Sequence, residues 1–293
     1  MSEIKLENIC YVYGAGTPYE IHALKDVNMT FENGKITGLI GHTGSGKSTL
    51  VELLNGILKP TSGRVLLDGR DIWEEPKKIR DIRFRVGVVM QYPEYQLFEE
   101  TVRADISFGP KNMGLSSDEI ADRVMESAEF VGLDESLLDK SPFELSGGQK
   151  RRAAIAGVIA MRPEVLVLDE PAAGLDPLGR ESILSKICEY NRRSGVTVII
   201  VSHNMEDMAV FCDKIAVMSN GENVMYGDRD EIFSRRDELL AVDLGVPLIT
   251  DVAYELSRLG VPVPDNIYTV ERAKESILAI LDGKDGMAGG GTE

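Results

Sequence analysis

Short apolar runs recur along the chain, and each is followed by polar or glycine-rich residues. They lie at residues 36–40, 86–90, 165–168 and 196–201. Continuous apolar runs of this length are typical of buried strands in a parallel sheet. Helical patterns follow or separate them, at residues 48–54, 101–108, 117–131, 145–160 and 177–193. This alternation predicts an α/β fold in which helices cover a mainly parallel sheet.

The two ends of the chain have different patterns. Residues 3–13 alternate apolar and polar side chains, and residues 27–31 and 62–68 give further strand signals. We therefore expect a β region at the N-terminus. Beyond residue 235 the chain is mostly helical, with prolines as punctuation, until it becomes rich in glycine. We expect a main domain at 1–235 with a helical subdomain at about 92–160, a helical C-terminal region at 236–283 and a disordered tail at 284–293.

Composition narrows the range of functions. The chain has 32 basic and 48 acidic residues and a net charge of −16, which argues against general nucleic-acid binding. Its three cysteines are widely spaced and suggest neither a zinc site nor a disulfide framework. No apolar run approaches the roughly 20 residues that span a bilayer, and the N-terminus has no signal-peptide pattern. We expect a cytoplasmic protein that would act at a membrane only through a partner.

The segment from Gly41 to Thr49 carries the strongest chemical signal. It fits the pattern of a glycine, four residues and then Gly-Lys-Ser, and it lies between a predicted strand and a predicted helix. Glycines let the backbone curl so that its N–H groups surround an anion, and a helix N-terminus also favours negative charge. We predict a nucleotide phosphate-binding loop formed by Gly41, His42, Thr43, Gly44, Ser45, Gly46, Lys47, Ser48 and Thr49.

Two side chains of this loop have specific predicted tasks. Lys47 can reach the β- and γ-phosphates, and the Ser48 hydroxyl can ligate Mg²⁺. His42 is expected to be a solvated member of the loop. Tyr13 stands just before a turn and could stack on the nucleotide base; the alternative is a half-buried strand tyrosine.

Two carboxylates follow the apolar run at residues 165–168. Asp169 and Glu170 come at the carboxyl end of a predicted strand, where α/β sheets bind ligands. We expect Asp169 to hold Mg²⁺ through water and Glu170 to be the base that polarises the attacking water. The two neighbours would differ in role because successive strand residues point to opposite faces.

Three further polar residues follow other predicted elements. Gln91 comes after the strand at 86–90 and could sense the metal and the water. His203 comes after the run at 196–201 and could hydrogen-bond the γ-phosphate, although a single His at a strand end is often structural. Asp176 could order a contact between subunits; the alternative is a turn-capping Asp.

Two other segments suggest contacts. Exposed aromatic residues in the loop at 91–98 indicate a contact surface for a partner, formed by Tyr92, Tyr95, Leu97 and Phe98. Packing within the helical subdomain is the alternative. Residues 145–149 provide a second anion-binding geometry at the start of a predicted helix. Its members are Leu145, Ser146, Gly147, Gly148 and Gln149.

Together these motifs resemble those of the ATPase subunits of ABC transporters. The phosphate loop, Gln91, the Leu-Ser-Gly-Gly-Gln signature, Asp169-Glu170, Asp176 and His203 occur in the order typical of that family, over residues 3 to about 235. More narrowly, residues 15–18, 42–44, 91–101 and 155–157 are similar to the energy-coupling factor (ECF) importers of vitamins and metals. The similarity is greatest to the second of their two ATPase subunits.

The resemblance implies an α/β fold of the P-loop NTPase, ABC type. A helical signature subdomain, an N-terminal antiparallel β region and a small helical C-terminal extension for dimerisation would complete it. It also implies ATP with Mg²⁺ and a head-to-tail dimer that closes on ATP binding and reopens on hydrolysis. In that dimer Ser146, Gly147, Gly148 and Gln149 of one subunit would complete the site on the other, whereas the residues alone leave contact within one subunit open.

The resemblance further implies partners and a location. They are a second ABC ATPase subunit, identical or related, a transmembrane coupling subunit gripped near residues 91–98, and a membrane-embedded subunit that binds the substrate. The protein would lie peripherally on the cytoplasmic face of the cell membrane.

Two other functions compete with this one. A soluble ABC-class ATPase acting on nucleic acid or ribosomes usually has two fused cassettes or a long coiled-coil insert, and this chain has neither pattern. A P-loop switch without turnover is disfavoured because Glu170 places a base next to Asp169.

Overall fold

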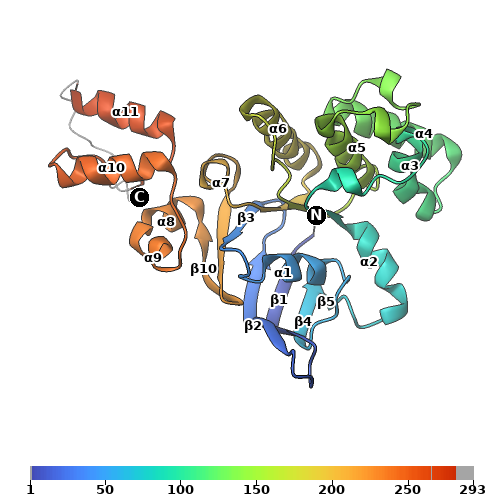
Figure 1. The fold of residues 1–293 in the computed structure, drawn as a ribbon, viewed down its shortest axis with the longest axis horizontal. Helices are drawn as coiled ribbons and strands as arrows, with labels where there is room; N and C mark the ends of the chain where they lie inside the picture. The colour runs from blue at the N-terminus through green and yellow to red at the C-terminus, as the bar shows by residue number, and fades with distance from the viewer. Residues whose placement is uncertain (1, 265, 282–293) are drawn as a thin grey trace, which may run out of the picture.

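The centre of the fold is a six-stranded sheet (Figure 1). The computed structural model describes residues 2–264 and 266–281. The strand order is β10-β9-β3-β8-β7-β6, and the neighbours pair in parallel except β10 with β9. Most of these strands are buried along their length, as their apolar runs predict. They span Ile36–Gly41 (β3), Val86–Val89 (β6), Val165–Asp169 (β7), Thr197–Val201 (β8), Lys214–Ser219 (β9) and Glu222–Asp228 (β10).

The N-terminal part of the chain forms an antiparallel sheet, which lies below the central sheet in Figure 1. Its order is β2-β1-β4-β5. Helix α1, Lys47–Leu54, shares one apolar core with strands of both sheets, so the phosphate-loop helix is fixed between them. The strands span Ile4–Tyr13 (β1), Ile21–Phe31 (β2), Ser62–Leu67 (β4) and Arg70–Asp71 (β5).

A second apolar core joins the opposite face of the central sheet to helices α3 to α8. Helices α3, α4 and α5 form a group at the right of Figure 1 and lie within residues 92–160, over which we expect a helical subdomain. Within the described ranges, no helix is long and apolar enough to cross a membrane. The helices span Ile79–Arg85 (α2), Val102–Asn112 (α3), Ser117–Val131 (α4), Gly147–Ile159 (α5), Pro177–Ser194 (α6) and Met205–Phe211 (α7).

Helices α8, α9, α10 and α11, at the left of Figure 1, form the last part of the chain that the structure describes. Helices α10 and α11 enclose a small core of their own. Tyr268 is only 2 % exposed, and its hydroxyl donates to Asp230 of α8, while its ring packs 5.8 Å from that of Phe233. The extension is thus fixed across the boundary expected at residue 235, and the expected tail at 284–293 lies outside the described residues. The helices span Arg229–Ser234 (α8), Arg236–Ala241 (α9), Leu248–Arg258 (α10) and Val270–Leu281 (α11).

Most expected elements occur where the sequence predicts them, and the differences have local causes. Strand β2 begins at Ile21, well before the expected residue 27, because it continues its antiparallel pairing with β1 up to Tyr13. Helix α7 was not predicted. It has seven residues, too few for a clear apolar period, and begins where the Asn204 side chain accepts the backbone N–H of Asp207 at 2.8 Å.

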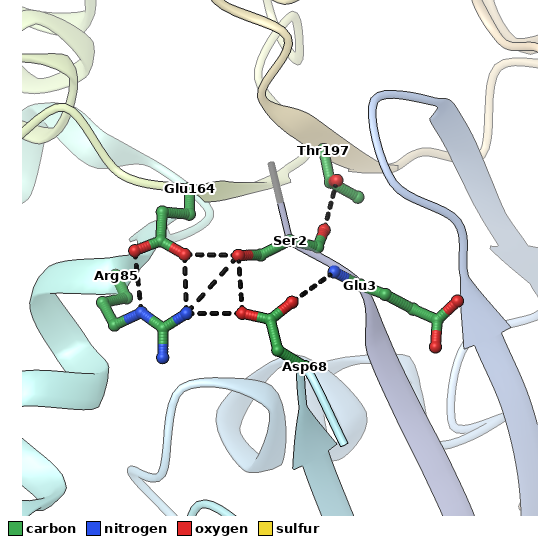
Figure 2. A network of polar contacts seen from close by, with 6 residues as sticks. All are labelled: Ser2, Glu3, Asp68, Arg85, Glu164 and Thr197. Carbon is green, nitrogen blue, oxygen red and sulfur yellow. Dashed lines mark hydrogen bonds and ion pairs between the residues drawn. The ribbon is translucent and has the colours of Figure 1, made fainter. Parts of the chain in front are cut away.

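A cluster of polar side chains ties the two sheets together at the amino ends of β6, β7 and β8 (Figure 2). Arg85 Nη2 donates to Asp68 Oδ2 (2.6 Å) and to Glu164 Oε2 (2.7 Å), and the Ser2 hydroxyl bonds both carboxylates. Thr197 at the start of β8 donates to the Ser2 carbonyl at 2.6 Å. The Arg85 guanidinium holds the pKa of Glu164 below its usual range. We call Ser2, Asp68, Arg85 and Glu164 the amino-edge cluster.

Candidate functional site

Four neighbouring strands of the central sheet end at one edge, and a candidate residue follows or ends each. β3 ends at Gly41, β7 at Asp169, and β8 is followed by His203 and β6 by Gln91. Parallel pairing puts these carboxyl ends side by side, at the edge where α/β sheets bind ligands. We call Lys47, Asp169, Glu170 and His203 the carboxyl-edge cluster.

Two glycines of the phosphate loop are required for different reasons. A Cβ at Gly41 would lie 2.4 Å from the carbonyl oxygen of Met218, so only a glycine lets strand β9 approach this closely. Gly46 has a φ of 101°, and a Cβ there would lie 2.7 Å from the carbonyl oxygen of Ala23. The first glycine therefore serves packing at the end of β3, and the second turns the chain into α1.

The Lys47 ammonium lies within the curl of the loop. Its Nζ donates to the carbonyl oxygens of Gly41 (2.7 Å) and His42 (2.9 Å). Burial lowers the pKa of Lys47, while the nearby charges of Glu170 and Asp169 oppose that shift. A partly desolvated cation held by the backbone is suited to attract an anion such as a phosphate.

Asp169 is a buried carboxylate at the end of β7, with 8 % of its surface exposed. Burial, and after it the adjacent Glu170 charge, raise the pKa of Asp169 to about 6, against the opposing effect of the Lys47 charge. A carboxylate in this state gains more from a nearby cation than a solvated one does, because its charge is poorly compensated. Its position and its raised pKa suit a cation ligand.

Glu170 and His203 are directly paired. Glu170 Oε1 lies 2.7 Å from His203 Nδ1 and accepts the His203 backbone N–H at 3.1 Å, and Oε2 accepts from the Ser202 hydroxyl at 3.3 Å. Glu170 is beyond β7, in a left-handed conformation with φ of 51°. The strand alternation invoked above for its role is therefore wrong. The left-handed turn, rather than the pleat, places its carboxylate at the end of β8.

Tyr13 ends β1 beside the phosphate-loop helix. Its hydroxyl lies 3.2 Å from Thr49 Oγ1, and its ring packs edge-on against Tyr11 with 4.8 Å between centroids. Tyr13 is exposed, at 39 %, so part of its ring remains free for a base. Thr49 is buried, whereas Ser48 beside it is exposed on α1.

The remaining residues of this edge are more exposed. Gln91 lies two residues beyond the end of β6 and is exposed. Thr43 and Gly44 are also exposed, and the His42 ring folds back on the loop, with Nδ1 at 2.9 Å from the Thr43 carbonyl. The structure thus brings the predicted loop residues, Gln91 and the carboxyl-edge cluster to one edge.

The signature segment forms the N-terminal cap of helix α5 and is not part of the strand ends that form that edge. Ser146 Oγ accepts the Gln149 backbone N–H at 3.3 Å, and Gln149 Oε1 accepts the Ser146 backbone N–H at 2.9 Å, which is a capping box. A Cβ at Gly147 or Gly148 would meet open space. Helix α5 and α1 belong to the two different apolar cores, so the two predicted half-sites lie on different parts of one subunit (Figure 1).

Asp176 is the N-cap of α6. Its Oδ1 accepts the Gly179 backbone N–H at 2.8 Å. The capping alternative therefore describes its contact within the subunit, and its exposure still permits a contact with another.

The aromatic loop forms one wall of a groove on the helical subdomain. Tyr92, Tyr95 and Phe98 are 49 %, 84 % and 64 % exposed, whereas Leu97 is half-buried against the core. Phe98 also packs against Phe108 of α3, with 4.9 Å between ring centroids. The groove has a volume of about 280 Å³, and its other lining residues include Phe108, Ala153, Ala154, Gly157 and Met161.

Sequence reasoning missed the roles of two residues, Ser202 and Arg151, that the structure brings to these segments. Ser202 bonds to Glu170, and Arg151 links Glu94 of the aromatic loop to the chain after Glu170. Ser202 stands next to His203 and could have been included with it. Arg151 gave no usable signal, since an Arg on a helix is usually solvated.

A phosphate-binding loop after β3, adjacent carboxylates at the end of β7 and a Ser-Gly-Gly-capped helix in the second apolar core define a P-loop ATPase of the ABC class. The family model described as ABC transporter matches residues 24–173. Among curated proteins, the energy-coupling factor transporter ATP-binding protein EcfA2 of Caldanaerobacter subterraneus subsp. tengcongensis is 53 % identical, covering 96 % of this chain and 98 % of that protein. The protein of the same name from Clostridium acetobutylicum is 52 % identical, covering 95 % and 98 %. The chain therefore belongs to the family of energy-coupling factor transporter ATP-binding proteins of the EcfA2 type.

Solved structures agree with this assignment of the fold. The chain is similar to cbiO1 from Clostridium perfringens, described as part of the ABC transporter complex cbiONQ, with a TM-score of 0.73 and 41 % identity over 88 % of this chain and 96 % of that one. It is also similar to the ATP-binding cassette MJ0796 in a dimeric post-hydrolysis state bound to ADP and Pi. There the TM-score is 0.71, with 28 % identity over 77 % of this chain and 98 % of that one.

Proposed function

We propose that this ATP-binding subunit works as one half of a nucleotide sandwich that powers an ECF importer of a vitamin or a metal ion. The observation that carries the proposal is the separation of two exposed half-sites within one chain. One is the loop around Lys47 on α1, and the other is the Ser146 cap of α5. Because they belong to different parts of the subunit, a second copy or a related chain would complete each site.

Within this sandwich, the carboxyl-edge cluster would carry out hydrolysis. Lys47 and the loop amides would hold the phosphates, and Tyr13 would stack on the base. Glu170 would orient and polarise the attacking water. His203, whose Nδ1 lies 2.7 Å from Glu170 Oε1, would hold the Glu170 carboxylate in place and reach the γ-phosphate through its other ring nitrogen. Gln91 would contact the same water.

The chain also offers a fitting set of ligands for Mg²⁺. Ser48 presents an exposed hydroxyl on α1, and Asp169 is a buried carboxylate whose pKa is raised by burial. Hydroxyl, carboxylate, amide and phosphate oxygens are the donors that Mg²⁺ prefers. Ser48 would bind the ion directly, Asp169 through water, and Gln91 would sense it. The bound ion would supply neutralising charge to the phosphates.

The groove beside the aromatic loop is the proposed contact with a transmembrane coupling subunit. Tyr92, Tyr95 and Phe98 are exposed and could contact that subunit directly, while Leu97 would form part of the floor. A separate membrane-embedded subunit would bind the substrate. The chain would then lie peripherally on the cytoplasmic face of the membrane, attached through this groove.

The C-terminal helices are the proposed additional contact between ATPase subunits, and Asp176 would contribute a contact nearer the nucleotide. Leu248, Leu259 and Leu281 are 71 %, 81 % and 75 % exposed, which supports association through these helices. A truncation after residue 235 would also remove the buried Tyr268, so it is a poor test. Changing Leu248 and Leu259 to Ser should weaken ATP-independent association and leave the fold intact.

The sandwich is tested by an obstructing change in the signature cap. In a Glu170→Gln background, Ser146→Arg blocks one of the two shared nucleotide sites, so it should keep ATP binding but strongly weaken ATP-dependent association, measured by light scattering with the second ATPase subunit present. Ser141→Arg is the matched control, because Ser141 forms a capping box with Glu144 just before the signature. ATP-dependent association that is as strong in Ser146→Arg as in Ser141→Arg would contradict the sandwich. Co-purification from solubilised membranes, with mass identification of the companions, tests the transporter itself.

A further inference from the structure

Arg151 is a charged side chain buried where three segments meet. It lies on α5, just beyond the signature cap, and only 4 % of its surface is exposed. Its Nη1 donates to the carbonyl oxygen of Ala173, and its Nη2 forms an ion pair with Glu94 at 3.3 Å. Its Nε is buried and has no hydrogen-bond partner among the described residues. A buried guanidinium is costly unless both of these partners stay in place.

The two partners of Arg151 belong to segments with different tasks. Glu94 is part of the aromatic loop, between Tyr92 and Tyr95, and is half-buried. Ala173 lies in the turn that follows Glu170, and its backbone N–H donates to the Glu170 carbonyl at 3.2 Å. Glu170 in turn pairs with His203. Contacts therefore run without interruption from the exposed aromatic loop through Arg151 to the carboxyl-edge cluster.

Two other side chains, those of Asp105 and Arg152, make hydrogen bonds in this region but do not contact the carboxyl-edge cluster. Asp105 of α3 accepts the backbone N–H groups of Phe98 (3.1 Å) and Glu99 (3.2 Å), which fixes the far end of the loop to the helical subdomain only. Arg152, the next residue of α5, donates to the Gly132 carbonyl at 3.1 Å, at the end of α4. Neither reaches the chain that follows Glu170, which sets Arg151 apart.

We infer that Arg151 is a positioning residue that couples occupation of the aromatic groove to the geometry of Glu170 and to the signature helix. The inference rests on the proposed function, in which a membrane partner binds at that groove. A partner that displaces Glu94 also weakens one of the two contacts that hold the buried guanidinium. Arg151 must then move with Glu94 or pull on the Ala173 turn, because an unpaired buried charge is unfavourable. The planar guanidinium of Arg151 can donate to Glu94 and to the Ala173 carbonyl at the same time, whereas the single ammonium of a lysine cannot reproduce both contacts in this geometry.

The link itself can be tested on the full chain without any partner. Glu94→Gln keeps the shape of the side chain but removes its charge, and Arg151→Met removes the link. Amide hydrogen exchange should accelerate at residues 92–98 and also at residues 171–176 in both variants. Arg152→Met is the matched control, since it removes the same charge one position along α5, and it should leave residues 171–176 unchanged. Unchanged exchange at 171–176 in Glu94→Gln and Arg151→Met would overturn the inference.

The coupling is tested in the assembled transporter. The readout is the ratio of ATPase activity in the membrane complex to that of the ATPase subunits alone. Glu94→Gln should lower this ratio by about fivefold or more, with the KM for ATP unchanged, whereas Arg152→Met should not. Arg151→Lys should recover part of the loss in Arg151→Met, because it restores charge at Glu94 but not both contacts. If these variants lowered the ATPase activity of the membrane complex and that of the isolated subunits by the same factor, the role of Arg151 would be purely structural, and the inference would be overturned.

These outcomes separate the inference from the proposed function. If the wild-type chain never assembles with a membrane partner, the proposed function fails, and the exchange experiment still decides whether Arg151 links the two segments. If the wild-type complex assembles and the ratio is insensitive to Glu94→Gln, the proposed function stands and the coupling role of Arg151 is wrong.

Discussion

The amino-edge and carboxyl-edge clusters lie at opposite ends of the same strands and differ in how their charges are balanced. At the amino edge, one guanidinium bridges two carboxylates, and a serine bonds both of them. Both charge states are favoured there: the pKa of Arg85 is raised and that of Glu164 is lowered, each by the other's proximity. At the carboxyl edge the shifts are reversed. The pKa of Lys47 is lowered and that of Asp169 is raised, both mainly by burial.

The difference indicates which cluster serves the fold and which serves a ligand. Charges that are satisfied within the chain stabilise the folded state, whereas buried charges that are poorly compensated cost stability until a ligand arrives. Residues at the amino edge join the two sheets, so their loss should be a stability effect. Substitutions at the carboxyl edge should mainly impair function, and they should change stability little or even increase it.

The largest expected effect separates chemistry from binding at the carboxyl edge. Glu170→Gln should lower the rate of ATP hydrolysis about 10²–10⁴-fold, because an amide cannot accept the proton of the attacking water. ATP affinity should remain within about twofold, which is about 0.4 kcal/mol. Phosphate release and nucleotide titration measure the two effects. Glu222→Gln, an exposed carboxylate on β10, is the control. Normal turnover in Glu170→Gln would remove Glu170 from its proposed role.

The next effect concerns the amino edge and should be confined to stability. Arg85→Met removes the bridge between Asp68 and Glu164 and should lower the free energy of unfolding by about 2–3 kcal/mol, after allowance for partial solvent exposure. Urea unfolding measures it. Arg64→Met is the control, because among the residues that the structure describes Arg64 pairs only with Glu7, at the surface. ATP hydrolysis per folded molecule should not change. A loss of turnover at unchanged stability would mean that the amino edge takes part in function.

Sequence reasoning predicted the carboxyl edge far better than the amino edge. The residues around Lys47, Asp169 and His203 follow apolar strands at recognisable spacings, so their convergence could be derived from the rule for parallel sheets. Ser2, Arg85 and Glu164 carry no motif, and their meeting depends on how the antiparallel sheet packs on the central one. The pairing of Glu170 with His203 was missed for a related reason, since a left-handed backbone at Glu170 cannot be seen in the residue type.

A smaller effect of opposite sign is expected at Asp169. Asp169→Asn removes a buried charge whose pKa is raised to about 6, so it should raise the free energy of unfolding of the nucleotide-free chain at pH 7 by about 1–2 kcal/mol. The same variant should bind ATP with less dependence on Mg²⁺. Thermal and urea unfolding measure the gain, with Asp118→Asn on the exposed face of α4 as control. A loss of stability would show that Asp169 is satisfied within the chain.

The smallest effect is the pH dependence of stability, in which the two clusters should differ in sign. Asp169 has a raised pKa when folded, so its protonated form is favoured, and its contribution falls as the pH rises from about 4 to about 6. The advantage of Asp169→Asn over the wild type should therefore grow across that window and then stay constant. Glu164 has a lowered pKa when folded, so its contribution is present above its unfolded pKa and disappears as the pH falls. The deficit of Glu164→Gln should accordingly shrink on acidification. Relative to the wild type, the free energy of unfolding should therefore rise with pH in Asp169→Asn and fall with pH in Glu164→Gln. If it changed in the same direction in both variants, the contrast between a structural edge and a functional edge would be wrong.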